Sequence, residues 1–315
     1  MKRILYMASL ALMILLGGAT AFAVMMLTAN SAYAANHGTP INETRNVSAT
    51  GTVWVNNLAG TVTVHGWDKN QVRVTGTLGA GSERLDVSNN DDGISIRVVL
   101  PEHSNRDVEG SDLVINVPKA AHLSVNTVSA DIKADGVSGT ARLKSVSGYV
   151  SLVSSDSEID ASSISGNVDV TGSAANAHIN AHAISSDVRI SRVDGELQAE
   201  SISGTVKVFD RNRLDRAQLS STSGNVDFVA ALDKNGNYSF NSTSGNLKLV
   251  FPETPDARFD VSSFSGNIEN SFGPKPQRTS EYAPGTELHF TSGAGSAQVN
   301  ARSLSGNISL RVAKD

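Results

Sequence analysis

A short unit recurs along most of the chain and constrains the fold more than any other feature. It consists of an aliphatic residue or Thr, then Ser-Gly, then a polar residue and a short run of alternating apolar residues, as in Ile164–Val170. Full copies place Gly at positions 148, 166, 204, 224, 245, 266 and 306, and weaker copies have Ala130 and Ser186 there. Most successive copies are 18 to 21 residues apart, and the last step of 40 is twice that period. Such a period is typical of stacked repeats.

Each copy carries a second strand-like segment just before the Ser-Gly, so one repeat is predicted to be two short strands and two turns. In one repeat, Ile159 and Ala161 are the apolar residues of the first strand, and Val168 and Val170 those of the second. Side chains alternate along a strand, so odd-numbered residues face inward in the first strand and even-numbered residues face inward in the second. The chain must bend there, and we expect Gly to supply the backbone angles of that corner.

A single repeat cannot bury its apolar row, whereas stacked repeats form a continuous core. The sequence therefore predicts an all-β fold, a single-chain parallel β-solenoid (β-helix) with coils of roughly 18–21 residues and right-handed winding. The low aromatic content of 5% suits a thin core. The Ser and Asn residues that flank the Gly are expected to stack from coil to coil as polar ladders.

Residues 1–34 are predicted to be a signal peptide. Lys2 and Arg3 precede an uncharged apolar stretch, Ile4–Leu27, and Ala32–Ala34 forms a small-x-small cleavage site. The apolar stretch is also long enough to span a bilayer, so an uncleaved membrane anchor is the alternative. Either interpretation predicts export through a secretory signal to the periplasm, the cell surface or the medium.

The remaining chain divides by its pattern. We expect a polar linker at 35–46, an irregular N-terminal β part or cap at 47–122, and the regular Ser-Gly solenoid at 123–315. A Pro-rich segment at 273–285 is predicted to be a loop inserted into an otherwise continuous stack. The last strand is expected to be an uncapped edge.

Composition limits the partners. A net charge of -5, a pI of 5.8 and the lack of a Lys/Arg-rich run argue against nucleic-acid binding. The sequence has no Cys, which excludes disulfides and thiolate metal sites.

Candidate reactive groups are few. Asp169 and Asp227 occupy equivalent outward positions, but Arg189, Lys207 and Lys248 occupy the corresponding positions of neighbouring repeats. Such a mixed-sign row is typical of a solvated face. The Asp and Asn residues next to the corners, Asp131 and Asp187 among them, are better explained as turn formers.

His178, Asn180 and His182 share one side of a strand, but no third metal ligand is evident, so surface histidines are favoured. No Gly-x-Ser-x-Gly elbow or phosphate-binding loop occurs. We therefore assign no catalytic, cofactor-binding or metal residues and no cofactor, and we expect no enzymatic activity.

Several aromatic residues could stack on sugars if they are exposed, although packing at strand ends is the favoured interpretation. They are Trp54, Trp67, Tyr149, Phe209 and Tyr238.

Three features together resemble a known family: the run Leu58–Asp68, with its Gly-Trp-Asp, the Val-Pro step of Ile115–Pro118, and the serial Ser-Gly units. The chain resembles the bacterial "putative adhesin" family of β-strand-repeat proteins over about residues 45–312. This resemblance implies a parallel β-solenoid in an exported envelope protein, with no catalytic residues to transfer. The Pro-rich segment departs from the family pattern.

The expected function is an exported, non-enzymatic, adhesin-like binding or structural module of the bacterial cell envelope. Its partners would be an envelope polysaccharide or a surface protein, with membrane contact only through an uncleaved N-terminal segment. One alternative is a carbohydrate-active β-helix enzyme. The other is a scaffold that self-associates through the C-terminal end of the solenoid.

Overall fold

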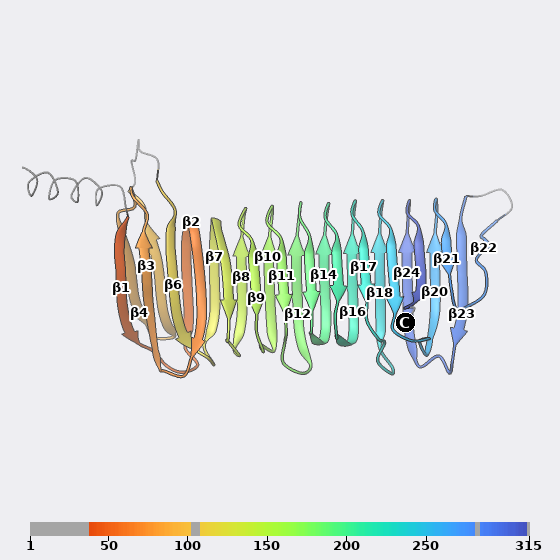
Figure 1. The fold of residues 1–315 in the computed structure, drawn as a ribbon, viewed down its shortest axis with the longest axis horizontal. Helices are drawn as coiled ribbons and strands as arrows, with labels where there is room; N and C mark the ends of the chain where they lie inside the picture. Colours follow the sequence, from red (N-terminus) through yellow and green to blue (C-terminus); the bar gives the residue numbers. More distant parts are fainter. Residues whose placement is uncertain (1–37, 102–107, 281–283, 314–315) are drawn as a thin grey trace, which may run out of the picture.

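The computed structural model describes residues 38–101, 108–280 and 284–313, and these form a long rod whose strands run across its axis (Figure 1). All regular elements within these ranges are β-strands. None of the described segments forms a helix long and apolar enough to span a bilayer. The predicted signal segment, residues 1–34, lies outside the described ranges.

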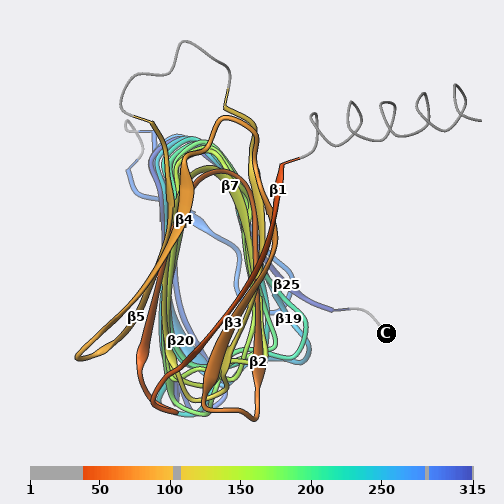
Figure 2. The same ribbon diagram turned by 90° about the vertical axis from the view of Figure 1, so that its left-hand side faces the viewer.

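The rod is flattened and has two sheet faces that meet at the turns (Figure 2). Along the rod, face A consists of β4 (Arg84–Asn90), β5 (Gly93–Val99), β2 (Thr52–Trp67), β7 (His122–Asp135), β8 (Thr140–Ser145), β10 (Glu158–Ser163), β12 (Ala177–Ala183), β14 (Asp194–Ser201), β16 (Arg213–Ser221), β18 (Asn237–Ser242), β24 (Ala297–Ser303), β20 (Ala257–Ser263) and β23 (Thr286–Ser292).

Face B consists of β1 (Thr39–Asn46), β3 (Gln71–Leu78), β6 (Ser111–Pro118), the second halves of β2 and β7, β9 (Val150–Val153), β11 (Val168–Thr171), β13 (Val188–Ser191), β15 (Val206–Phe209), β17 (Val226–Val229), β19 (Leu247–Phe251), β25 (Ile308–Val312) and β21 (Ile268–Asn270). The predicted parallel β-solenoid is therefore confirmed, with antiparallel pairs only towards its ends.

The change of inward parity occurs as predicted. Ile159 and Ala161 of β10 are buried, and so are Val168 and Val170 of β11. Both faces thus point their apolar rows into one narrow core. Towards the C-terminal end the core becomes aromatic, with Phe228, Tyr238, Phe240, Phe251 and Phe259 fully buried.

Glycine is required at the Ser-Gly corners for a different reason from the one expected. None of the corner glycines has a positive φ, so special backbone angles are not the cause. Instead, a Cβ at Gly166 would lie 1.9 Å from the carbonyl oxygen of Gly148, and one at Gly245 would lie 1.7 Å from that of Gly224. At the corners that carry Gly, neighbouring coils approach so closely that a side chain fits only if the backbone shifts.

Two ladders of hydrogen bonds stabilise the corner. The buried Oγ of Ser163, three residues before the Gly, accepts a hydrogen bond from Gly166 N and donates one to Gly148 O, both at 2.9 Å. After the Gly, Asn246 N donates to Asn225 Oδ1 of the preceding coil at 3.0 Å. The predicted role of the corner Asn residues as turn formers is confirmed.

The two ends of the rod depart from the regular pattern. β1 forms an antiparallel pair with β3, although its residues fall in the span expected to be a linker. At the other end, β23 runs antiparallel to β20 and pairs with the short β22 (Gln277–Arg278). The aromatic rings of Phe259 and Phe290 stack there with centroids 4.7 Å apart, and Phe272 packs on both. This cluster covers the C-terminal end of the core.

The order of the last coils corrects two predictions. β24 lies between β18 and β20 (Figure 1), and β25 lies between β19 and β21. The chain therefore leaves one coil position open after β19 and fills it with its final coil. The Pro-rich segment is not a loop on a continuous stack, because it belongs to the path that returns the chain to this position. The last strand is not an open edge, because it pairs on both sides.

Candidate functional site

The outward rows of the rod show where the candidate acids lie. Asp169 pairs in register with Arg189, Arg189 with Lys207, and Lys207 with Asp227. The two carboxylates are therefore three strand spacings apart, about 14 Å. Asp169 also accepts a hydrogen bond from the Tyr149 hydroxyl at 2.5 Å. The row is a mixed-sign surface, as its sequence indicated.

The histidines of β12 pair with acids of the neighbouring strand β14. His178 Nδ1 lies 3.2 Å from a Glu196 carboxylate oxygen, and His182 Nδ1 lies 3.9 Å from Glu200. The described ranges hold no group of three or more His, Cys, Asp or Glu side chains placed to bind a metal ion.

The candidate aromatic residues are covered to different degrees. Tyr238 is fully buried, and its hydroxyl donates to Leu214 O and accepts from Asp233 N. Trp67 is half-buried, and its indole N–H donates to Gln71 O at 2.7 Å. Among the aromatic residues that the structure describes, Phe264 is the exposed one, with 58% of its surface accessible. It sits directly before a Ser-Gly corner, a position where the other repeats have an aliphatic residue or Thr.

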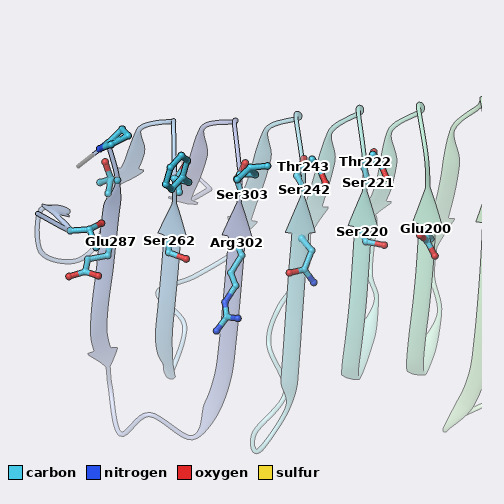
Figure 3. A pocket seen from close by; sticks show the side chains of 18 residues that line it. Glu200, Ser220, Ser221, Thr222, Ser242, Thr243, Ser262, Glu287, Arg302 and Ser303 are labelled. Carbon is cyan, nitrogen blue, oxygen red and sulfur yellow. The ribbon is translucent and has the colours of Figure 1, made fainter. Parts of the chain in front are cut away.

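Phe264 borders a groove of about 550 Å³ that crosses six neighbouring strands of face A near the C-terminal end (Figure 3). One wall is the outward row of the sheet. Its members come from β14, β16, β18, β24, β20 and β23, and in that order they are Glu200, Ser220, Asn241, Arg302, Ser262 and Glu287.

The other wall is the Ser-Gly corner, with Thr222, Thr243, Leu304 and Phe264. Pro284 and Gly285, which precede β23, also line the groove. One long wall thus offers hydroxyl, amide and charged groups, and the other offers apolar surface with an exposed ring. The groove depends on the order of the coils, because Arg302 belongs to the last coil and lies between Asn241 and Ser262.

Charge is spread along the groove. Glu200 is near His182, and Glu287 lies 3.7 Å from His289 Nε2. Arg302 makes no ion pair or side-chain hydrogen bond with any other residue of the described ranges. Its guanidinium group is therefore available to a ligand near the centre of the groove.

The two carboxylates of the groove cannot act on one bond. Glu200 and Glu287 are five strand spacings apart in the row, about 24 Å. Paired acids of glycosidases are about 5 to 9.5 Å apart. The groove can therefore bind a polar chain, but it does not bring two acids together.

One acid is perturbed elsewhere. Asp156, in the turn between β9 and β10, is fully buried, and neither carboxylate oxygen has a hydrogen-bond partner in the described structure. Burial raises its pKa from 3.8 to about 6. It lies alone in the interior, so it affects stability and not a site.

The sequence-based interpretation missed the groove and the buried serine ladder. The serine signal was present, because Ser stands three residues before most corner Gly positions, as at 145, 163, 201, 221, 242, 263 and 303. No short sequence pattern indicated the groove. Its central residue, Arg302, lies there only because the last coil is placed between two earlier coils.

A protein-family model matches most of the chain. The model of the Toastrack DUF4097 family matches residues 62–311. No curated protein matches the chain.

Several solved structures are similar at low identity. One is a putative adhesin from Bacteroides fragilis, with 10% identity, coverage of 88% of this chain and 99% of that chain, and a TM-score of 0.29. Another is a putative cell adhesion protein from Clostridium sporogenes, with 8% identity, coverage of 87% and 100%, and a TM-score of 0.22. A third is a putative lipid binding protein from Parabacteroides distasonis, with 15% identity, coverage of 88% and 98%, and a TM-score of 0.37.

The resemblance seen in the sequence is thus confirmed by a family match over most of the chain. The chain belongs to the Toastrack DUF4097 family.

Proposed function

We propose that this chain is an exported, non-enzymatic, adhesin-like binding module of the bacterial cell envelope, and that it holds a polysaccharide in the groove of face A. The observation that carries the proposal is the composition of the two groove walls. Hydroxyl, amide and guanidinium groups can exchange hydrogen bonds with sugar hydroxyls. The exposed Phe264 ring provides an apolar face against which a sugar ring can pack.

The shape of the groove supports a chain-like ligand. Its outward row extends over about 24 Å at regular strand spacing, which is long for a small metabolite. Its volume is within the range of ligand sites. A polysaccharide presents similar groups at intervals and can therefore contact several strands at once.

The enzymatic alternative has less support. It would need acids close to one bond, and the groove acids are far apart. The self-association alternative was based on an open last strand, and that strand is paired on both sides. A polysaccharide-binding module is therefore the function that this geometry favours.

The test is a binding assay of the purified chain against peptidoglycan, lipopolysaccharide and a panel of polysaccharides, with released sugars measured in the same samples. We expect binding without product release, and at least tenfold weaker binding for Phe264→Ala and Arg302→Ala, which corresponds to about 1.4 kcal/mol each.

Two controls lie outside the groove. Lys144 is in the outward row of Arg302, and Val153 is an exposed apolar residue at the end of β9. Lys144→Ala and Val153→Ala should leave polysaccharide binding unchanged. Equal loss in all four variants, absence of binding, or product release would contradict the proposal.

A further inference from the structure

A row of exposed aliphatic side chains follows the narrow edge of the rod, outside the groove. We call it the ridge, and it consists of one residue from each of six successive coils: Leu58, Val128, Val146, Ile164, Ile184 and Ile202. Each exposes between 40% and 44% of its surface. Four backbone hydrogen bonds of 2.7–2.9 Å connect a Ser after a ridge residue to the ridge residue of the preceding coil, as in Ser165 N to Val146 O, and Leu58 and Val128 lie side by side in the register of β2 and β7. The ridge is therefore straight, and it extends over about 24 Å.

No charged residue adjoins the ridge in sequence. The preceding positions are buried, and most are the Ser or Thr residues of the corner ladder, such as Thr127 and Ser145. The following positions are mainly exposed Ser residues, such as Ser147 and Ser165. The edge thus presents one apolar line beside one hydroxyl line. A contiguous exposed apolar strip of this kind is typical of an interaction surface.

The chain enters the rod at this same edge. Thr39, the first residue of β1, pairs with Leu78 at the end of β3. β3 pairs in turn with β6. The first residue of β6, Ser111, pairs with Gly60 of β2, two residues after Leu58. In Figure 1, β1 starts at the upper edge, where the narrow turns lie. In the sequence, residues 28–37 separate the rod from the uncharged stretch Ile4–Leu27. Ten residues reach at most about 35 Å, so if the segment is the uncleaved anchor of the alternative interpretation, it keeps this edge close to the lipid.

We propose that the ridge rests on the surface of a lipid bilayer, with its aliphatic side chains inserted between headgroups. A bilayer is deformable and accepts a single line of side chains, whereas a protein partner would need a matching groove. Hydroxyl groups beside the line can bind headgroups. Amphipathic surfaces bind membranes in proportion to the apolar area that they bury.

A second copy of the chain fits the ridge less well. Six side chains exposing about two fifths of their surface offer on the order of 500 Å² in total, below the roughly 800 Å² per partner of a stable interface. No ridge residue lines the polysaccharide groove, although the same corner row continues beyond Ile202 into the corner wall of the groove.

The test uses the full chain in phosphatidylcholine liposomes with single fluorescent labels. The sequence has no Cys, so Ile164→Cys and Ile184→Cys each give one labelling site for an environment-sensitive dye on the ridge. Val153→Cys and Val229→Cys are matched controls, since these exposed aliphatic residues end strands that lead away from the ridge edge. Thermal unfolding confirms that all four variants fold.

We expect the ridge dyes to shift to the blue in liposomes and to be quenched by lipid-attached nitroxides several-fold more than the control dyes. Equal quenching at the two edges would overturn the proposal. Loss of the blue shift as the protein is diluted into excess lipid would also overturn it, because a second copy would then be the occupant of the ridge.

A second measurement removes the apolar line. The triple variant Ile164→Ser, Ile184→Ser and Ile202→Ser should abolish the selective quenching of a dye at Val146→Cys. The control double variant Val153→Ser and Val229→Ser should preserve it. Unchanged quenching in the triple variant would show that the ridge does not hold the edge on the lipid.

Discussion

The corner glycine shows how one residue type enables the stacking of coils. The Cβ that Gly224→Ala introduces would lie 1.9 Å from the carbonyl oxygen of Gly204. The coils must separate locally, so we expect a loss of at least about 2 kcal/mol in unfolding free energy, measured by denaturant titration. Ser186 already carries a Cβ at this corner, and its hydroxyl donates to Ser165 O at 2.6 Å. Ser186→Gly should therefore cost less than Gly224→Ala, and the reverse order would contradict the steric explanation.

The buried corner serine is the second residue-scale requirement. Ser163→Ala removes two hydrogen bonds at once and leaves Gly166 N and Gly148 O without their partner. Unsatisfied buried groups are costly, so we expect a loss of about 2 kcal/mol in unfolding free energy. Ser165 is in the same turn but is exposed. Ser165→Ala should change the stability by less than about 0.5 kcal/mol. Equal effects of the two variants would show that the ladder is not important.

The buried carboxyl group of Asp156 leads us to predict an unusual pH dependence of the unfolding free energy. Its pKa is raised to about 6 in the folded state from 3.8, so the folded chain binds a proton at a higher pH than the unfolded chain. This group therefore adds stability as the pH falls from about 7 towards 4. Asp156→Asn should be more stable than wild type near neutral pH by up to about 3 kcal/mol, and that difference should shrink in acid. A constant difference across this range of pH would contradict the assignment.

At this scale the sequence predicts some roles but not others. The stacking Asn residues were predictable, because a polar residue after each corner repeats at a fixed position. The reason for the corner Gly was not, since close approach of a neighbouring coil depends on a contact between residues about 20 positions apart. The exposure of Phe264 was not predictable either, because nothing in the repeat pattern shows how far the ring before a corner is covered.

At the scale of the strands, the unexpected element is the final coil. Sequence periodicity predicts the two strands of each coil, because most coils carry the same alternating pattern. It cannot order coils that share this pattern, since β24 could pair equally well beside several strands. Only the step of 40 residues between Gly266 and Gly306 indicated that the path changes there.

Removal of the final coil should therefore damage the interior of the stack. A chain that ends at Ser296 lacks β24 and β25, and it exposes the edges of β18 and β20 on face A. Exposed strand edges pair with other chains. We expect this truncated chain to form soluble oligomers or aggregates in light scattering, whereas a chain that ends at Val312 stays monodisperse. A monodisperse chain ending at Ser296 would mean that the final coil is dispensable.

At the scale of the whole molecule, the rod presents two different surfaces. The groove near the C-terminal end is polar, with one exposed ring. The ridge, closer to the start of the rod, is apolar and uncharged. The proposed arrangement places the ridge on lipid close to the N-terminal segment and the polysaccharide groove farther along the same edge, beside face A. Both surfaces arise from stacking, because each is a row of single residues from successive coils.

The order of the last coils is the central structural claim, because it places Arg302 in the groove and closes the end of the rod. Engineered disulfides test it directly, since the chain has no Cys of its own. Ser239 and Asn300 are in register on β18 and β24, about 4.8 Å apart, which a disulfide can bridge. Asp260 is in register with Asn300 on the other side, so it lies about 9.6 Å from Ser239, beyond the reach of a disulfide.

The measurement is the extent of intrachain disulfide formation in the double variants, by mass spectrometry under mild oxidation. We predict that Ser239→Cys with Asn300→Cys, and Asp260→Cys with Asn300→Cys, form the bond readily, and that Ser239→Cys with Asp260→Cys does not. A strong bond in the third pair and none in the first would mean that the coils stack in sequence order, and it would contradict both the closed end and the groove.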